Sequence, residues 1–550
     1  MNDAITALAD DYFDTYLAAG PTEAHLLAHY EHADRFEDPS RTEEDRRIAE
    51  LDALIARADA LDEGALDERD RLTRQVLLAD ARNRVGMLEG RFAEFAADPI
   101  FGPQKALPLL AGMLAIPSAD VAHAMVSKYE SVGGYYRALA ERQREGLAAG
   151  RVSPAFAVAA TIAQIDEVLA MPADEDPLLG TTTLPAGVDA AAWRERLVAA
   201  ITGSIRPGMA AYRDVLRDEV LAHARSDDRS GLSWLDGGEE DYDRTLRYFT
   251  TTAKSAQEIH EIGLEQVASL AEEYRGLGPE VVGTADLQEI FEALRTDPTL
   301  HFEHGDQLVE ASEIAMRRAW DAIGDWFEVL PQAPCEVQAT TTGAKAFYFA
   351  PATDGSRPGT FFVNVADPEA WGTFELESMA FHEGIPGHHL QLAIASELSG
   401  VPEFRKHIHN SAYAEGWGLY TERLADEMDL YSGPLDRMGI FSADSLRACR
   451  LVVDTGLHAL GWSREQAVEY MVANSPMTEA ICRPEVDRYI LTPGQATSYM
   501  IGRLEILRMR SEARERQRGR FDIKAFHSAV LDGGSLPLDV LDKVVRERLA

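Results

Sequence analysis

Three histidines and one glutamate stand within eight positions of the sequence, in the run His382-Glu383-Gly384-Ile385-Pro386-Gly387-His388-His389. A helical His-Glu pair followed by a second His is typical of zinc hydrolases, where two imidazoles bind the metal and the carboxylate activates a water molecule. The usual spacing between the histidines is four residues, whereas His388 and His389 follow His382 by six and seven. The run therefore predicts a zinc site of altered spacing, with Glu383 as the general base.

The dipeptide Pro386-Gly387 offers a way to restore the usual geometry. On an unbroken helix, His382 and His389 would lie about 10 Å apart along the axis, too far for one zinc ion with bonds of about 2 Å. Pro removes a helical hydrogen bond and Gly accepts the backbone angles of a bulge, so we treat the two residues as an insert. His382 and His388 are then the predicted ligands, and His389 orients a ligand or faces the substrate. The alternative is a set of polar side chains on a kinked helix without metal.

A catalytic zinc ion takes three protein ligands and keeps a fourth position for water. Glu415 is the predicted third ligand, because its neighbours in the string AEGWG are apolar and an unpaired carboxylate there would be costly. Glu422, two turns further, either supports a ligating His or belongs to a solvated helix face. His407 and His409, on the approach to this helix, are weaker ligand candidates.

Peptide hydrolysis also needs a donor for the oxyanion, and the downstream run CRPEVDRYILTPGQATSYMIGR offers Tyr489 and Tyr499. Tyr499 is favoured, because the break at TPGQ can start a helix that aims it inward. The alternative for both is aromatic core packing. Gln495, Arg488 and Arg503 are candidates for supporting or substrate contacts, although an Arg in so acidic a chain often forms a structural ion pair.

Amphipathic helices must position these residues, because apolar residues recur three and four apart along most of the chain, with Gly or Pro at the breaks. A mainly α fold follows, and helical periodicity resumes at Thr373 for the zinc-site segment. The helices predicted in the N-terminal half are Asp3–Ala19, Leu66–Ala96, Ala119–Ala149, Pro154–Met171, Ala190–Arg225 with an interruption at Pro207-Gly208, and Asp241–Arg275.

A small β-sheet is predicted just before the zinc-site segment. The strings CEVQATT, AKAFYFAP and GTFFVNV, between residues 331 and 365, are short, aromatic and β-branched. We expect an antiparallel sheet whose free edge at GTFFVNV aligns an extended peptide. The alternative is that the last two strings form a core hairpin.

One metallopeptidase-like unit spanning residues 1–550 is expected, with soft internal divisions. The Pro-, Gly- and Thr-rich segment 172–189 is the predicted link after an N-terminal helical part. The parts are 1–171, 190–330, the sheet at 331–365, the zinc-site helices at 373–510 and the C-terminal helices at 511–550.

Composition excludes several classes of partner. The chain of 550 residues has a formal net charge of −39, which disfavours nucleic acid and membrane surfaces. Three cysteines without CxxC spacing indicate neither a disulfide framework nor a thiolate zinc site. The N-terminal segment is acidic where a secretory signal would be basic. A cytoplasmic protein is predicted.

The strings AFHEGIPGHHLQ, SAYAEGWGLYTERL and RYILTPGQATSYMIGR resemble the bacterial domain of unknown function 885 family, over almost the whole chain. That family is held to be related to the gluzincin zinc peptidases. The resemblance implies a large helical metallopeptidase-like fold with a deep cleft and one zinc ion. By motif position, His382, His388 and Glu415 would be ligands and Glu383 the base. The Pro-Gly insertion departs from the ordinary gluzincin pattern, so the choice between His388 and His389 stays open.

The predicted function is zinc-dependent hydrolysis of amide bonds in small or extended peptides. A zinc hydrolase of a non-peptide amide or ester is one alternative, because the same constellation polarises any carbonyl. A non-catalytic helical scaffold with a structural metal site is the other, and a closed shell with His389 as fourth ligand would favour it.

Overall fold

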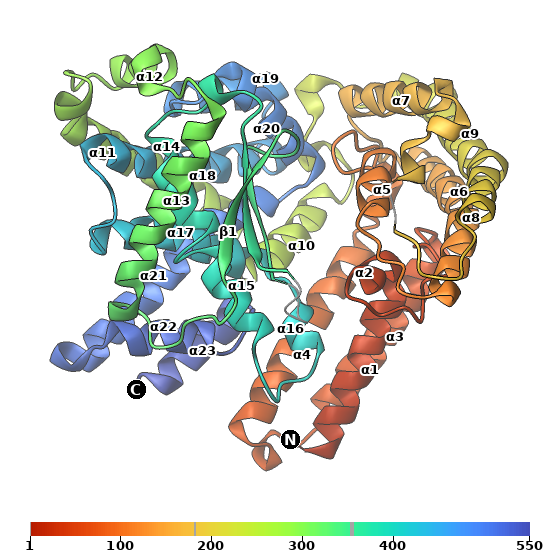
Figure 1. Ribbon diagram of the computed structural model, residues 1–550, viewed down its shortest axis with the longest axis horizontal. Helices are drawn as coiled ribbons and strands as arrows, with labels where there is room; N and C mark the ends of the chain where they lie inside the picture. Colours follow the sequence, from red (N-terminus) through yellow and green to blue (C-terminus); the bar gives the residue numbers. More distant parts are fainter. Residues whose placement is uncertain (1, 181–182, 352–356) are drawn as a thin grey trace. The chain divides into compact units, whose positions relative to one another are not determined.

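The computed structural model describes residues 2–180, 183–351 and 357–550 (Figure 1). The chain is mainly α-helical with a small mixed three-stranded sheet. The strands are β1 (Cys335–Thr340), β2 (Ala346–Phe349) and β3 (Gly359–Asn364). The α-helices are α1 (Asp3–Ala19), α2 (Pro21–Leu26), α3 (Arg41–Asp59), α4 (Glu68–Glu89), α5 (Pro103–Ala111), α6 (Ala119–Ala148), α7 (Ala155–Ala170), α8 (Ala190–Ala200), α9 (Arg206–Val215), α10 (Gly238–Thr250), α11 (Ala256–Val281), α12 (Leu287–Thr296), α13 (Gly305–Ala322), α14 (Glu375–Glu383), α15 (His388–Ser396), α16 (Phe404–His407), α17 (Ser411–Glu427), α18 (Pro434–His458), α19 (Arg464–Asn474), α20 (Glu479–Leu491), α21 (Ser498–Gln517), α22 (Ile523–Leu531) and α23 (Leu538–Arg548).

The chain forms two compact units. The predicted link at 172–189 lies inside unit 1, and its residues 181–182 lie outside the described residues. The main division instead falls between Arg244 and Thr245, within helix α10, where composition gives no signal. Unit 1 comprises Met1–Asp70, Asp80–Arg244 and Gly461–Arg464, and unit 2 comprises Arg71–Ala79, Thr245–Leu460 and Glu465–Ala550.

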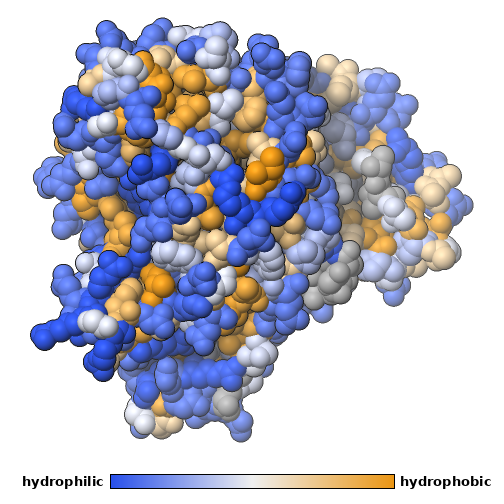
Figure 2. Space-filling model, turned by 60° about the vertical axis from the view of Figure 1, so that its left-hand side comes forward, coloured by the Kyte–Doolittle hydropathy of each residue, from blue (hydrophilic) through white to orange (hydrophobic). Residues whose placement is uncertain are grey.

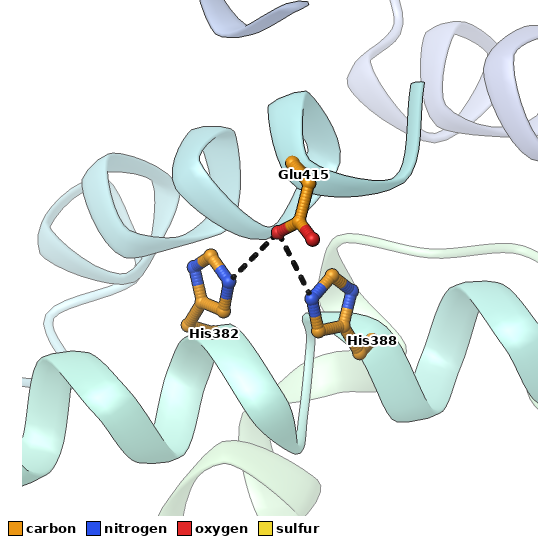
Figure 3. Close-up of side chains that lie close together, drawn as sticks. All are labelled: His382, His388 and Glu415. Carbon is orange, nitrogen blue, oxygen red and sulfur yellow. Dashed lines mark ion pairs between the residues drawn. The ribbon is translucent and has the colours of Figure 1, made fainter. Parts of the chain in front are cut away.

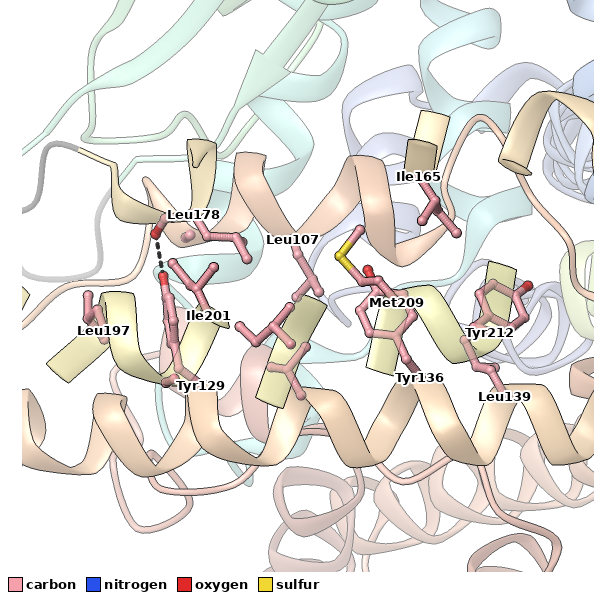
Figure 4. Close-up of a cluster of buried hydrophobic side chains, with 14 of the residues drawn as sticks. Leu107, Tyr129, Tyr136, Leu139, Ile165, Leu178, Leu197, Ile201, Met209 and Tyr212 are labelled. Atoms are coloured by element: carbon pink, nitrogen blue, oxygen red, sulfur yellow. Dashed lines mark hydrogen bonds between the residues drawn. The ribbon is translucent and has the colours of Figure 1, made fainter. Parts of the chain in front are cut away.

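Unit 1 is built around the 30-residue helix α6. Its buried side chains, among them Tyr136 and Leu139, pack against residues of α5, α7, α8 and α9 (Figure 4). The Tyr129 hydroxyl donates to the carbonyl of Leu178 at 2.7 Å, which satisfies a polar group inside this core. The predicted interruption at Pro207-Gly208 is misplaced, because both residues lie in the first turn of α9, where Pro is tolerated, and the α-helix gives way to a π-helical segment earlier, at Ile201–Ile205.

The predicted continuous helix Asp241–Arg275 is wrong, because the chain breaks between α10 and α11. Thr251 has φ 50°, in the left-handed region that ends a helix. Ser255 then caps α11 and forms a capping box with Glu258. The string Ser-Ala-Gln-Glu carries this start signal in the sequence.

The prediction of a wholly antiparallel sheet is also wrong. The strand order is β1-β3-β2. Strand β3 pairs parallel with β1 and antiparallel with β2. The central position follows from burial, since β3 carries the fully buried Phe361 and Val363. GTFFVNV therefore has no free edge, and the open edges belong to β1 and β2.

Unit 2 places α14, α15, α17, α18 and α21 around the predicted site. Helix α17 packs along α21, α18 along α11, and α14 against both α17 and α18. The face in Figure 2 is mostly hydrophilic, with hydrophobic side chains in separate small areas, as the acidic composition leads one to expect. Among the described residues, no helix combines the length and apolar character that crossing a membrane requires.

Candidate metal centre

The two predicted zinc-binding histidines lie on two separate helices, not on one bulged helix. Helix α14 ends at Glu383 and α15 starts at His388, with four residues between them (Figure 3). A Cβ atom on Gly387 would overlap the carbonyl oxygen of His382, so this tight connection requires glycine. The break brings the rings of His382 and His388 to a centroid distance of 4.7 Å.

A triad of side chains converges at this break. Nε2 of His382 and Nε2 of His388 each lie 3.6 Å from Oε2 of Glu415. The three ligand atoms lie within 4.8 Å of one another, and Glu415 reaches the histidines from α17 (Figure 3). Tetrahedral zinc with bonds of about 2.0–2.1 Å places its ligand atoms about 3.3 Å apart. The donor set of two imidazoles and one carboxylate therefore fits a zinc ion with one open position.

Glu422 lies behind His382 and not on a solvated helix face, the other position considered for it. Its Oε1 atom is 2.8 Å from Nδ1 of His382, and the hydroxyl of Ser378 donates to Oε2 at 2.8 Å. With Nδ1–H as donor, the Nε2 lone pair of His382 faces Glu415. Burial lowers the pKa of His382, but Glu415 and Glu422 outweigh it and raise the pKa to about 9.

The two imidazoles favour the ionised form of the Glu415 carboxyl. Burial raises the pKa of this carboxyl, but the neighbouring rings of His382 and His388 bring it well below its usual range. A metal ion that binds here must displace the proton of His382, because only a neutral imidazole is a ligand.

Helix α17 is shaped to accept the ring of His382. A Cβ atom on Gly418 would lie 2.7 Å from Cε1 of His382. The indole N–H of Trp417 donates to the carbonyl of Pro386 at 3.0 Å, which ties α17 to the connection between α14 and α15. The string AEGWG thus supplies the ligand, the anchor and the space for the ring.

Glu383, the predicted general base, is the last residue of α14. It is 9% exposed, and its carboxylate makes no hydrogen bond or ion pair with the part of the chain that the structure describes. Its charge contributes to the raised pKa of His382. A carboxylate at this position is available to exchange protons with a bound molecule.

His389 points away from the triad, which contradicts its predicted supporting or substrate-facing role. It is fully buried, with the Tyr348 hydroxyl 2.8 Å from Nδ1 and the Ala333 carbonyl 3.1 Å from Nε2. Burial lowers its pKa to about 4. The structure therefore brings His388, not His389, to the site. The weaker candidates His407 and His409 are not in the triad found among the described residues.

The two predicted oxyanion donors differ in position. Tyr499 is partly exposed, and its phenol is close enough to Glu415 for that carboxylate to raise its pKa, in addition to burial. Tyr489 is fully buried, and its hydroxyl donates to Glu485 at 2.5 Å and accepts from Nε of Arg450 at 2.9 Å. Tyr489 is therefore a structural residue, and its predicted catalytic role is wrong.

The three polar candidates beside these tyrosines also separate. Arg503 is buried in an ion pair with Asp444, so the predicted substrate contact is wrong for this residue. Nη1 of Arg488 donates to Gln495 at 2.6 Å, and Nη2 donates to Glu485 at 3.0 Å. Arg488 and Gln495 thus stay beside Tyr499.

Sequence reasoning missed several residues that shape the site. Ser378 stands four residues before His382, the helical spacing that places both on one face. Arg447 and Arg450 lie on α18, a helix buried over most of its length. The available signal was the apolar residues around the two arginines in the string RACRLVV. The sequence contains no signal for Tyr348, because only the topology of the sheet brings this residue to His389.

The comparisons with known proteins agree with this fold. A crystal structure from Colwellia psychrerythraea, described as a "putative lipoprotein", is similar with a TM-score of 0.91 and 23% identity over 99% of each chain. A second, from Shewanella oneidensis and described as a "putative lipoprotein of unknown function", has a TM-score of 0.78 and 19% identity over 98% of this chain and 99% of its own. No curated protein matches the sequence. The family model described as "Bacterial protein of unknown function (DUF885)" matches residues 21–545, so the chain belongs to the DUF885 family.

Proposed function

We propose that this protein is a zinc-dependent hydrolase that cleaves amide bonds in small or extended peptides. The observation that carries the proposal is the convergence of His382, His388 and Glu415 within 4.8 Å, next to Glu383, whose carboxylate has no partner in the described ranges. The resemblance of the motifs to gluzincin peptidases supports the same reaction.

The number of ligands favours catalysis over a structural metal site. Structural zinc sites are closed by four protein ligands, and catalytic sites keep one position open. His389, the fourth ligand that a closed shell would need, is held by Tyr348 and Ala333 instead. Among the described residues the candidate site has three ligands.

In the proposed reaction each residue of the site has a defined role. A bound zinc ion would supply Lewis-acid chemistry, polarising the amide carbonyl and lowering the pKa of water. Glu383 takes the proton of the attacking water and delivers it to the leaving nitrogen. Tyr499 donates its hydroxyl proton in a hydrogen bond to the oxyanion. Glu422 keeps the Nε2 lone pair of His382 directed at the site.

Metal analysis of the purified protein tests the proposal first. We expect about one zinc ion per chain in the wild type and none in the double variant His382→Ala, His388→Ala. Glu383→Gln should keep the metal and lose peptide hydrolysis by about 10²–10⁴-fold. Glu369→Gln, at an exposed position, is the matched control and should keep both. No metal after zinc loading, or full activity in Glu383→Gln, would overturn the assignment.

The cytoplasmic location inferred from the sequence stays a prediction. The two similar structures carry the description "putative lipoprotein", and that description applies to those proteins. The proposed chemistry does not depend on the compartment.

A further inference from the structure

Arginine side chains gather around the ring of Tyr499. Cζ of Arg450 lies 4.6 Å from the ring centroid, and Cζ of Arg447 lies 5.9 Å from it. Arg488 is close enough to act on the charge of the same phenol. We call Arg447, Arg450 and Arg488 the arginine cluster.

The arginine cluster contains more positive than negative charge. A single carboxylate, Glu485, pairs with both Arg450 at 2.8 Å and Arg488 at 3.0 Å. Arg447 has its nearest carboxylate at 3.9 Å, on Glu422, which already accepts a hydrogen bond from His382. In a chain with a net charge of −39, this local excess of cations needs a separate explanation.

Two nitrogen atoms of the arginine cluster also lack partners. Arg447 is 8% exposed and Arg450 is 6% exposed. Among the described residues, Nε of Arg447 and Nη1 of Arg450 have no hydrogen-bond acceptor. An unsatisfied buried donor destabilises a protein, and a charged one does so more strongly. This destabilisation favours an anionic partner that the chain itself does not supply.

The arginine cluster adjoins the candidate metal centre through two shared residues. Glu415 is close enough to Tyr499 to raise the pKa of its phenol, and the guanidinium of Arg450 lies over the ring of the same tyrosine. Glu422 contacts both His382 and Arg447. Tyr499 and Glu422 therefore link the arginine cluster to the residues of the candidate metal centre.

Given the proposed function, on which this step rests, we propose that the arginine cluster binds a carboxylate group of the peptide substrate. The planar guanidinium matches a carboxylate with two parallel hydrogen bonds, and burial strengthens such a pair. The carboxylate is either the C-terminus of a short peptide or an acidic side chain, and both present the same chemistry.

Matched peptides separate these two sources. The zinc-loaded protein is given tetrapeptide pools with a free or amidated C-terminus, and with Glu or Gln at one position. Preference for the free acid by about tenfold or more in kcat/KM identifies the C-terminus, and the same preference for Glu over Gln identifies a side chain. Equal cleavage of all pools overturns the carboxylate subsite and leaves the proposed hydrolase intact.

Variants connect the preference to the arginine cluster. Arg447→Gln should reduce the preference about tenfold, through a higher KM for the preferred pool. Arg437→Gln is the matched control, because Arg437 is an exposed residue of α18 that pairs with Asp426. Should Arg447→Gln fail to fold, the less buried Arg488→Gln replaces it. An unchanged preference in the folded variant overturns the inference.

Direct binding separates failure of the subsite from failure of the hydrolase. Saturation-transfer NMR compares N-acetylalanine with N-acetylalaninamide on the zinc-loaded protein. If no pool is cleaved, binding of the acid alone, lost in the folded arginine variant, still supports the subsite. Equal binding of acid and amide, or no binding of the acid, overturns it.

Discussion

Nδ1 of His382 and Oε1 of Glu422 lie 2.8 Å apart, and this contact joins helix α14 to helix α17. Both residues are buried, at 3% and 1% exposure. The contact sets which nitrogen of His382 carries hydrogen, and so which nitrogen faces Glu415. Glu422 therefore orients the ring of His382 without being one of the three residues of the triad.

Replacing Glu422 with Gln should weaken zinc binding by about 10–100-fold, because the ligand His loses its charged partner. Competition with a chromophoric chelator measures the affinity. Glu427→Gln is the control, since Glu427 lies on the same helix and pairs with Arg510 at 2.6 Å. Equal zinc affinities of the Glu422→Gln variant and the wild type would contradict the positioning role.

Local spacing predicts much of the site. His382, His388 and Glu415 come together at the connection between two short helices. The spacing and types of these residues in the sequence were enough to predict them. The predicted helix Asp3–Ala19 coincides with α1 for the same reason, since its apolar period is local.

Long-range contacts account for what the sequence does not predict. His389 faces Tyr348, 41 residues earlier, only because β2 lies beside α15. Strand order likewise depends on burial in the folded chain, and GTFFVNV, with the fully buried Phe361 and Val363, takes the centre despite following β2 in the chain. The sequence alone does not distinguish Tyr489 from Tyr499. In the structure they differ, because the hydroxyl of Tyr489 donates to Glu485.

Gly418→Ala tests the space left for the ring of His382. The added Cβ would lie 2.7–2.9 Å from three ring atoms, and Glu422 holds that ring in place. Zinc affinity should fall at least about tenfold, although Ala favours the helix by about 1 kcal/mol.

Gly416→Ala is the matched comparison on the same helix. Its Cβ would lie 2.5 Å from the backbone of Gly502 on α21, so this variant should lose stability through helix packing. Zinc titration and urea unfolding of both variants separate the two effects. Unchanged zinc affinity in Gly418→Ala would show that the ring has room to move.

Tyr499→Phe tests the oxyanion donor. Burial and then Glu415 raise the pKa of Tyr499, so its phenol keeps its proton at neutral pH. Loss of one such donor typically lowers kcat about 10²–10³-fold, and zinc content should not change. Tyr413→Phe is the control, because Tyr413 donates to the Val530 carbonyl at 3.0 Å and should affect stability only. Equal kcat values in wild type and Tyr499→Phe would remove Tyr499 from the mechanism.

His527 makes the stability of unit 2 depend on acid pH. Its ring is fully buried and stacked on Phe327, with the Trp326 carbonyl 2.8 Å from Nδ1 and the Tyr420 hydroxyl 2.8 Å from Nε2. Burial lowers its pKa from 6.5 to about 3. Between these values the unfolded chain binds more protons than the folded one, so the stability from the neutral ring is complete above pH 6.5 and is lost as the pH falls toward 3.

At pH 4 the loss from this one group is on the order of 3 kcal/mol. His527→Gln removes the titrating ring, so its urea midpoint should start lower but fall less steeply between pH 6.5 and pH 4 than that of the wild type. His304→Gln, at an exposed position, should keep the wild-type slope. Parallel midpoint curves for the wild type and His527→Gln would mean that protonation of His527 does not destabilise the fold, and that other groups set the acid limit.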